Sequence, residues 1–506
     1  MSYPTAVEAE LARRRRSPLG RIVRLLILLW GVVFLLAIIL LATVAGRFMS
    51  SGPTVYADID DHFRFGSIGA ETASGLPYRV WKALPFLFPE HFDGRKDYST
   101  FGFLYEDDRD LPIGISERTQ QGVDLVWFNC AVCHTGRYRL EERGDPHLAS
   151  GMPANTLDLG KFTQMVIDVS GDPKLAPEPL MAAMEEAGVG LDPLDKIIWR
   201  FAVFPRLREG LLDRAARLRP LLARQPDWNP GRVDTFNPYK VLEFDIAASE
   251  LDETEVVGAS DFPSIFLQGP REGMQLHWDG NNDSLAERNL SAALGAGVTP
   301  ETVDHASIER VAAWLSDFEP PASPHRPDPE AVVRGRELYM DKCAACHGYQ
   351  GSEGYVFEGA KLGTVELIGE IGTDPARLDS YTKAFSDLQK EKLFAGTPHA
   401  FRRFRKTDGY ANAPLDGLWL RGPYLHNGSV PTLADLLEAP ENRPATFLRG
   451  GDVIDGNGGF VSPACEPDMP NCFDTRLPGN SNSGHVYGVG LDATAKADLL
   501  AYLLTF

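Results

Sequence analysis

Basic residues are scarce in this sequence. The chain has 50 Lys and Arg against 70 Asp and Glu, which gives a net charge of −20. The first 24 residues carry six Arg and two Glu, a net charge of +4, so the remainder has a net charge of −24. A protein that binds nucleic acid needs a basic face. The composition therefore argues against a nucleic-acid partner.

The sequence also lacks the alternation of strands and helices that builds βαβ units. This absence bears on its cysteines, of which there are only six. A Cys-x-x-Cys pair in a βαβ context would indicate a thioredoxin-like redox site, and neither pair here has that context. Cys465 and Cys472 lie outside the pairs, in a loop rich in Pro, Asp and Asn. We expect a disulfide there if the loop is exported, with two free thiols as the alternative.

The other four cysteines form two copies of one pattern. Residues 130–134 read Cys-Ala-Val-Cys-His, and residues 343–347 read Cys-Ala-Ala-Cys-His. This is the attachment signature of c-type haem: two thiols add to the porphyrin vinyl groups, and the histidine ligates the iron. Structural zinc also uses paired cysteines, but zinc does not explain a histidine after each pair. The sequence predicts two covalently bound haem c groups, held by Cys130, Cys133, His134, Cys343, Cys346 and His347.

One long apolar run lies near the N-terminus. Residues 25–46 are 22 uncharged positions dominated by Leu, Ile and Val, and a helix of this length rises about 33 Å, enough to cross a bilayer core. The arginines precede it, so we predict a cytoplasmic basic segment at 1–24. We predict a single transmembrane anchor at 25–46, in a bacterial inner membrane, with the bulk of the chain in the periplasm. A signal peptide cleaved after Ala45 is the alternative, although its apolar core would be unusually long.

The two halves of the chain share one plan. In each, a short helix leads into the haem motif, irregular segments rich in Gly and Pro follow, and a helix closes the half. The predicted leads are 117–129 and 330–340, and the predicted closing helices are 307–318 and 493–506. We therefore expect a mainly α fold with two cytochrome c-like domains that carry long irregular insertions. The domains span 47–319 and 330–506 and are joined by a proline-rich linker at 320–329.

The second ligand of each iron decides function, because a strong sixth ligand makes an electron carrier and an open position admits O₂ or peroxide. Past the second motif, Met469 lies within the Cys465–Cys472 loop and His399 lies in a basic run. His485 has a surface-loop setting. His426, in the aromatic-flanked turn at 422–429, is the predicted ligand of the second haem; a histidine bonded within a turn is the alternative. For the first haem no ligand stands out among His147, His277 and His305.

Four segments together resemble a known family. Residues 129–136, 269–282, 343–348 and 423–429 are similar to the bacterial di-haem cytochrome c peroxidase superfamily. The chain most resembles the branch that includes the haem-dependent rubber oxygenases. The resemblance runs from about Phe63 to the C-terminus. The haem motifs are shared by all c-type cytochromes, whereas their combination with Trp278-Asp279-Gly280 and the 423–429 turn is more specific.

The resemblance implies roles for individual residues. Trp278 matches the tryptophan that relays electrons between the haems, although composition alone favours ordinary aromatic packing. His426 matches the histidine that caps the second haem. The resemblance also implies a calcium ion between the domains. The peroxidases instead use a later Met or Tyr, at a position that falls near Pro440, and an acidic residue that Glu301 matches poorly in spacing. The rubber oxygenases are secreted, so their substrate does not transfer to an anchored chain.

These observations predict a membrane-anchored, periplasmic di-haem c-type redox enzyme. The first haem would react with O₂ or hydrogen peroxide, and the second haem and Trp278 would carry electrons. One alternative is a peroxidase fed by a small electron-transfer protein, for which the acidic surface suits a cationic partner. The other is a membrane-tethered electron carrier without catalysis, in which both irons have six ligands.

Overall fold

The computed structural model describes residues 5–8, 10–11 and 18–506. The arginine run at 13–16 lies outside the described residues. The chain forms two compact units, which are residues 1–52 with 119–124, and residues 53–118 with 125–506. Helices cover 43% of the chain and strands 11%. The expected mainly α class is therefore corrected to a mixed one, because the irregular segments pair locally as short strands. The division into haem domains at 47–319 and 330–506 stays a prediction.

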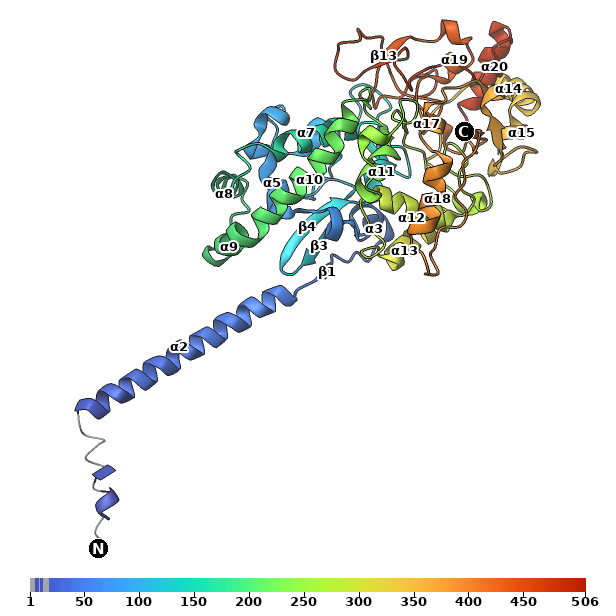
Figure 1. The fold of residues 1–506 in the computed structure, drawn as a ribbon. Coiled ribbons are helices and arrows are strands. Elements are labelled where there is room, and N and C mark those ends of the chain that lie inside the picture. Colours follow the sequence, from blue (N-terminus) through green and yellow to red (C-terminus); the bar gives the residue numbers. More distant parts are fainter. Residues whose placement is uncertain (1–4, 9, 12–17) are drawn as a thin grey trace. The chain divides into compact units, whose positions relative to one another are not determined.

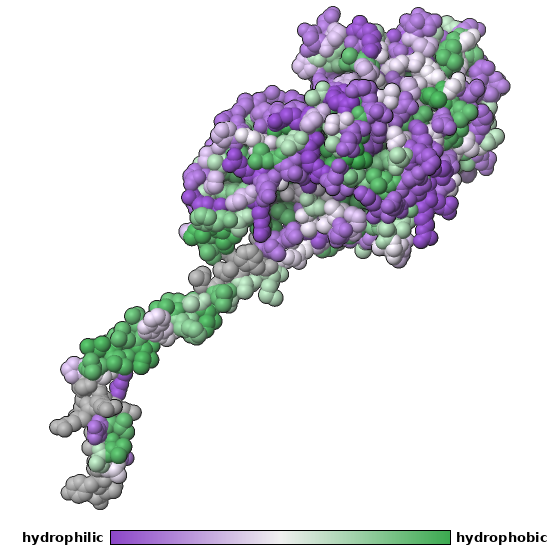
Figure 2. Space-filling model, viewed as in Figure 1, coloured by the Kyte–Doolittle hydropathy of each residue, from purple (hydrophilic) through white to green (hydrophobic). Residues whose placement is uncertain are grey.

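The first unit is dominated by one long apolar helix, α2 (Pro18–Met49). The most apolar 18-residue window within residues 18–43 has a mean hydropathy of 3.2, and none of that window is buried. Figure 2 shows the apolar surface along most of this helix. At 1.5 Å per residue the 32 residues extend about 48 Å, more than a bilayer core requires. A helix of this kind suits a membrane anchor or a signal sequence.

The second unit contains helices of ten to nineteen residues, separated by long irregular segments (Figure 1). They are α5 (Tyr78–Leu87), α7 (Leu159–Ser170), α8 (Pro177–Glu186), α10 (Phe204–Leu222), α12 (Leu285–Gly295), α13 (His305–Leu315), α14 (Pro329–Lys342), α18 (Lys383–Lys392) and α20 (Ala493–Leu503). Shorter helices are α3 (Ile59–Phe65), α4 (Ala70–Ser74), α6 (Ala131–His134), α9 (Pro193–Ile198), α11 (Asn237–Glu243), α15 (Ala344–His347), α16 (Ile368–Ile371), α17 (Ala376–Asp379) and α19 (Leu433–Leu436). Aspartate, serine or threonine side chains cap many of their N-termini, as at Asp158, Ser284, Asp304 and Asp328.

The strands are two to six residues long. One four-stranded sheet has the order β1-β3-β4-β2, with β1 (Gly52–Pro53), β2 (Leu76–Pro77), β3 (Ile115–Gln120) and β4 (Val123–Phe128). Five antiparallel pairs are β5 (Thr135–Tyr138) with β6 (His147–Ser150), β7 (Arg232–Asp234) with β8 (Ala259–Asp261), β9 (Tyr349–Gly351) with β10 (Gly354–Val356), β11 (Val365–Leu367) with β12 (Gly409–Ala411), and β13 (Thr446–Leu448) with β14 (Cys472–Asp474). These short strand pairs stabilise segments that are otherwise irregular.

The predicted helical lead at 117–129 is wrong, since β3 and β4 form a hairpin there. Gln121 and Gly122 at its tip both have positive φ, of 51° and 74°. Two successive residues of this kind make the tight turn that suits a two-residue hairpin. Val123, Leu125 and Trp127 then lie on one side of the strand β4. In a short apolar run, this period of two is difficult to distinguish from the period of a helix.

The predicted helices at 330–340 and 493–506 are confirmed as α14 and α20, which pack against each other. The two cross closely because Gly335 carries no side chain: a Cβ there would lie 1.9 Å from the Asp498 carbonyl oxygen. Arg334 forms an ion pair with Asp498 at 2.7 Å, and Tyr339 packs on Tyr502 at 5.1 Å between ring centroids. This helix pair supports the second haem motif, which follows α14 directly.

Candidate haem c sites

The first haem motif lies in a one-turn helix, α6, between the hairpin strand β4 and the strand β5. The Asn129 side chain accepts from the Ala131 amide and donates to the Gly66 carbonyl, both at 2.9 Å. Gly114 packs against the turn, where a Cβ would meet the Val132 backbone at 2.2 Å, and its φ of 86° favours glycine. The motif is thus held in place from both sides.

His134 is oriented as an iron ligand requires. Its Nδ1 lies 2.9 Å from the Pro263 carbonyl oxygen, so Nδ1 donates and Nε2 is left for a metal. Burial, together with the nearby Arg288 cation, lowers the pKa of His134 to about 4. The imidazole is therefore neutral at physiological pH, which is the form that binds a metal.

The second motif repeats this arrangement. The helix α14 ends at Lys342, and α15 carries His347, whose Nδ1 lies 2.8 Å from the Ala413 carbonyl oxygen. The Tyr355 hydroxyl donates to the His347 carbonyl, and the Tyr339 hydroxyl donates to the Gly348 carbonyl at 2.8 Å. Burial lowers the pKa of His347 as well. Both histidines thus share one backbone-anchored, neutral geometry.

The residues present fit haem c better than zinc. All four motif cysteines are free thiols, and burial raises the pKa of Cys130 to about 11 and of Cys343 to about 12. Among the described residues, no three His, Cys, Asp or Glu side chains converge as metal ligands would. The two cysteine pairs therefore do not meet in a shared zinc site. The calcium ion stays a prediction.

A second histidine ring faces His347. The ring centroids of His347 and His485 are 6.2 Å apart, with 46° between the planes. With metal–nitrogen bonds of about 2 Å, two imidazoles that bound one metal ion from opposite sides would have ring centroids roughly 6 Å apart. His485 has a φ of 46°, and its amide donates to the Ile371 carbonyl at 2.8 Å. A strained backbone of this kind is common at functional sites. The spacing fits an iron held between the two rings.

His426, the predicted ligand, is buried in its turn. Its ring stacks on Tyr410 with centroids 4.0 Å apart, and its carbonyl accepts from the Asp261 amide at 2.9 Å. Nε2 is buried without a hydrogen-bond partner among the described residues. Burial lowers the pKa of His426 to about 3. This environment keeps the ring neutral, but the ring recorded beside His347 is that of His485.

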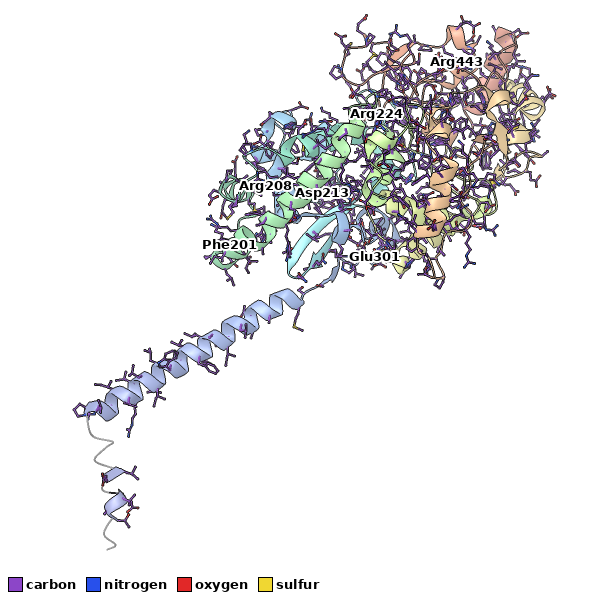
Figure 3. All side chains as sticks on the ribbon, in the orientation of Figure 1. Phe201, Arg208, Asp213, Arg224, Glu301 and Arg443 are labelled. Carbon is purple, nitrogen blue, oxygen red and sulfur yellow. A yellow bond between two sulfur atoms is a disulfide. The ribbon has the colours of Figure 1, made fainter. Side chains whose placement is uncertain are left out.

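The other candidate ligands have different surroundings. His147 stacks on Tyr138, and His305 stacks on His399 with centroids 3.7 Å apart. His277 is half-buried, and its Nδ1 lies 2.6 Å from the Asn281 side-chain oxygen. Burial lowers the pKa of His277 to about 4, and the Arg288 cation that acts on His134 contributes to this shift. Of the three histidines considered for the first haem, His277 is therefore the one that shares the electrostatic environment of His134. Met469 and Glu301 are exposed, Glu301 near the start of α13 (Figure 3).

Trp278 connects the two segments that orient the motif histidines. Its indole Nε1 donates to the Asp261 carbonyl at 2.8 Å, two residues before Pro263, the partner of His134. The Ala411 amide donates to the Trp278 carbonyl at 2.8 Å, two residues before Ala413, the partner of His347. Trp278 is thus hydrogen-bonded to both of the segments whose carbonyl groups hold the motif histidines.

Sequence reasoning did not identify Arg288 or the two carbonyls as parts of the sites. A backbone carbonyl leaves no mark on residue type, so Pro263 and Ala413 gave no signal. His485 was considered but left aside on the composition of its neighbours. Cys465 and Cys472, in contrast, form the expected disulfide, with 5.8 Å between their Cα atoms.

Comparison with known proteins bears on the second site. The chain is 30% identical over 281 residues to the uncharacterized protein y4iM of Sinorhizobium fredii, a match that covers 49% of this chain and 64% of that protein. It is 26% identical over 545 residues to the uncharacterized protein y4iJ of the same organism, covering 83% of this chain and 85% of that protein. The chain thus spans about two thirds of the first relative. A family model described as RoxA-like, cytochrome c-like matches residues 409–448, which include Ala413 and His426. Residues 409–448 are therefore similar to part of a RoxA-like, cytochrome c-like domain, a likeness that indicates haem c binding.

Proposed function

We propose that this protein is a membrane-anchored, periplasm-facing di-haem c-type cytochrome that acts as a redox enzyme. The first site would react with O₂ or peroxide, and electrons would pass through the second site and Trp278. The observation that carries this proposal is the position of Trp278, hydrogen-bonded to the segments that orient His134 and His347. The indole supplies the bond to the Asp261 carbonyl, and the Trp278 backbone carbonyl accepts the bond from Ala411.

A bound haem c supplies an iron that changes oxidation state and can take O₂ or peroxide on an open face. The protein contributes orientation and charge. His134 and His347 each present Nε2 because a backbone carbonyl holds Nδ1. Arg288 is half-buried and places a cation near Cys130 and His134; desolvation lowers its pKa to about 10, so it stays charged at neutral pH. A fixed positive charge there favours negative charge that develops at the first site.

The two sites differ in what faces the motif histidine. We assign His485, in place of His426, as the second ligand at the second site, because its ring lies 6.2 Å from that of His347. Within the part of the chain that the structure describes, no histidine ring packs on His134 in the same way. An occupied second site and an open first site would give an electron store beside a reactive centre. If His347 and His485 both bind the haem iron, they would also favour a low reduction potential relative to a Met and His pair.

Electron paramagnetic resonance and optical spectra of the oxidised protein test this assignment, with His485→Ala and His426→Ala measured beside the wild type. We expect one high-spin and one low-spin haem in the wild type. Loss of the low-spin signal in His485→Ala, and its retention in His426→Ala, would support His485 as the ligand. The reverse pattern would return the role to His426.

The same samples separate the proposed enzyme from its alternatives. After reduction, consumption of O₂ with an organic substrate would indicate an oxygenase. Turnover with hydrogen peroxide and a reduced small cytochrome would indicate a peroxidase. If both haems are low-spin and the reduced protein reacts with neither oxidant, the catalytic proposal fails and a tethered electron carrier takes its place.

A further inference from the structure

One end of the second unit exposes an apolar helical surface. The helix α9 (Pro193–Ile198) continues through a π-helical turn (Trp199–Val203) into α10. Phe201 is 75% exposed and Ile197 is 59% exposed. They are four residues apart, on one side of the helix. Figure 2 shows an apolar patch at this end of the unit, where Figure 3 labels Phe201. We call Ile197, Phe201 and the arginines at 200, 206 and 208 the α9–α10 tip.

The tip is firmly supported from its other side. Trp199 is buried and packs on Phe204 with ring centroids 5.7 Å apart. Leu211, Ala215 and Leu218 of α10 are also buried, and α10 packs on α7. The segment therefore has its own core-facing side, and Phe201 is an additional apolar group directed to the surface. An exposed apolar patch rimmed by polar residues marks an interaction site more often than a random surface.

The tip is also basic, in contrast to the rest of the protein. Residues 197–208 hold three Arg and no Lys, Asp or Glu, a net charge of +3, whereas the whole chain has −20. Arg200 pairs with Glu178 at 2.8 Å. Arg206 and Arg208 are exposed and form no ion pair with any residue in the described part of the chain. Figure 3 labels Arg208 near Phe201 on this segment.

An exposed aromatic residue beside unpaired arginines is the combination by which surface helices bind a bilayer interface. Anionic lipid attracts the arginines, and the apolar side chains enter the boundary between headgroups and acyl chains. Aromatic side chains are well suited to this boundary. Anionic lipid would repel the acidic parts of the protein surface and would not attract the neutral parts. The positive charge of the tip therefore favours this part of the protein for contact with an anionic bilayer.

We propose that the α9–α10 tip binds the anionic lipid bilayer in which α2 is anchored. The inference goes beyond the redox function and rests on retention of α2. Nine residues, 50–58, of which Gly52 and Pro53 form the strand β1, join α2 to the helix α3. Even a fully extended segment of nine residues spans at most about 32 Å. The bilayer surface is therefore always within reach of the body, and a weak interfacial contact is sufficient at such a high effective concentration. Bound in this way, the body would have a fixed orientation on the membrane.

The test uses the full-length holoprotein in lipid nanodiscs with a fluorescent label at position 201 or 197. Cys465 and Cys472 form a disulfide, and on the proposed function the four motif cysteines are bonded to haem, so Phe201→Cys and Ile197→Cys can be labelled selectively. Val333→Cys, at another exposed apolar position on α14, is the matched control. In discs of phosphatidylglycerol and phosphatidylcholine, we expect a blue-shifted emission at 197 and 201. Spin-labelled lipid should quench these two positions several-fold more than position 333.

A charge variant checks the source of binding. Arg206→Glu with Arg208→Glu should abolish the blue shift in anionic discs, while the haem absorption spectrum confirms that the variant is folded. A label at 201 that responds like the label at 333 would overturn the proposal, as would a chain that does not enter the discs. Lipid-independent shielding of position 201 would also overturn it, since it would indicate a protein partner instead.

Discussion

Trp278 is the residue on which both proposed haem sites depend through the backbone. Replacement by Phe keeps an aromatic ring but removes the indole donor to the Asp261 carbonyl. We expect Trp278→Phe to slow electron transfer between the haems several-fold and to leave both spin states unchanged. Stopped-flow reduction, followed at each haem, measures this rate. Trp419→Phe is the matched control, because the buried Trp419 also donates to a backbone carbonyl, that of Pro321 at 3.0 Å. Equal rates in both variants would leave Trp278 as a packing residue.

His62 predicts a dependence of stability on pH. Its Nε2 donates to the Ser307 hydroxyl at 2.9 Å, and that hydroxyl donates in turn to the Ser67 carbonyl at 2.6 Å. Burial, reinforced by the Arg310 cation, lowers the pKa of His62 in the folded state. The unfolded chain therefore binds the proton first as the pH falls below about 6.5, and the free energy of unfolding decreases.

Substitution by glutamine isolates this contribution, because His62→Gln retains an N–H donor for Ser307 and does not titrate. Urea unfolding between pH 7 and 5 should show a steeper loss of stability in the wild type than in the variant. Parallel pH profiles would show that His62 makes no net contribution to acid sensitivity.

For individual residues, the sequence predicted a role where that role depends on neighbouring residues in the chain. The spacing within each Cys-x-x-Cys-His motif specifies attachment and one ligand, so these six residues could be proposed without a fold. The opposite ligand depends on which distant loop reaches the iron. His426 and His485 lie 59 residues apart in sequence, and only the folded arrangement of His485 beside His347 favours one of them.

Among the helices, replacing glycine by alanine should change the free energy of unfolding in opposite directions at Gly335 in α14 and at Gly210 in α10. Gly335→Ala would force a Cβ against the Asp498 carbonyl, 1.9 Å away in the present geometry. Overpacking of this kind typically costs about 1–3 kcal/mol. Gly210→Ala in α10 meets nothing within 4 Å and should add about 0.5–1 kcal/mol through helix propensity. Urea denaturation of both variants measures the two changes. A neutral Gly335→Ala would show that the helices separate without cost.

The success of sequence reasoning differed among elements for a physical reason. The helices α14 and α20 begin at clear aspartate caps, Asp328 and Asp492, and their prediction was right. The apolar residues of the segment 117–129 fit a helix or a strand almost equally. The pairing of β3 with β4, and of β4 with β2, decides the outcome. That pairing is a tertiary property, which a single segment does not encode.

For the whole molecule, the retention of α2 determines where the protein works. A retained anchor predicts that the protein stays in the membrane pellet after a carbonate wash, with its original N-terminus. Leu35→Arg with Leu36→Arg should release it, because each arginine at the centre of a span costs about 2.5–3.5 kcal/mol. Val55→Arg, outside the span, is the control. A mature N-terminus just after Ala45 would identify a cleaved signal sequence instead.

The placement of His485 also sets an order of events during biosynthesis. His347 and His485 are separated by 138 residues of sequence, and an exported chain emerges from its N-terminus. On the proposed export, the cysteines at 343 and 346 would become available for haem attachment well before the last 22 residues leave the translocation channel. On our assignment, the second iron acquires its capping histidine among the final steps of synthesis. A protein that keeps α20 but lacks this one imidazole, as His485→Ala does, would therefore have an electron store that is itself open to peroxide.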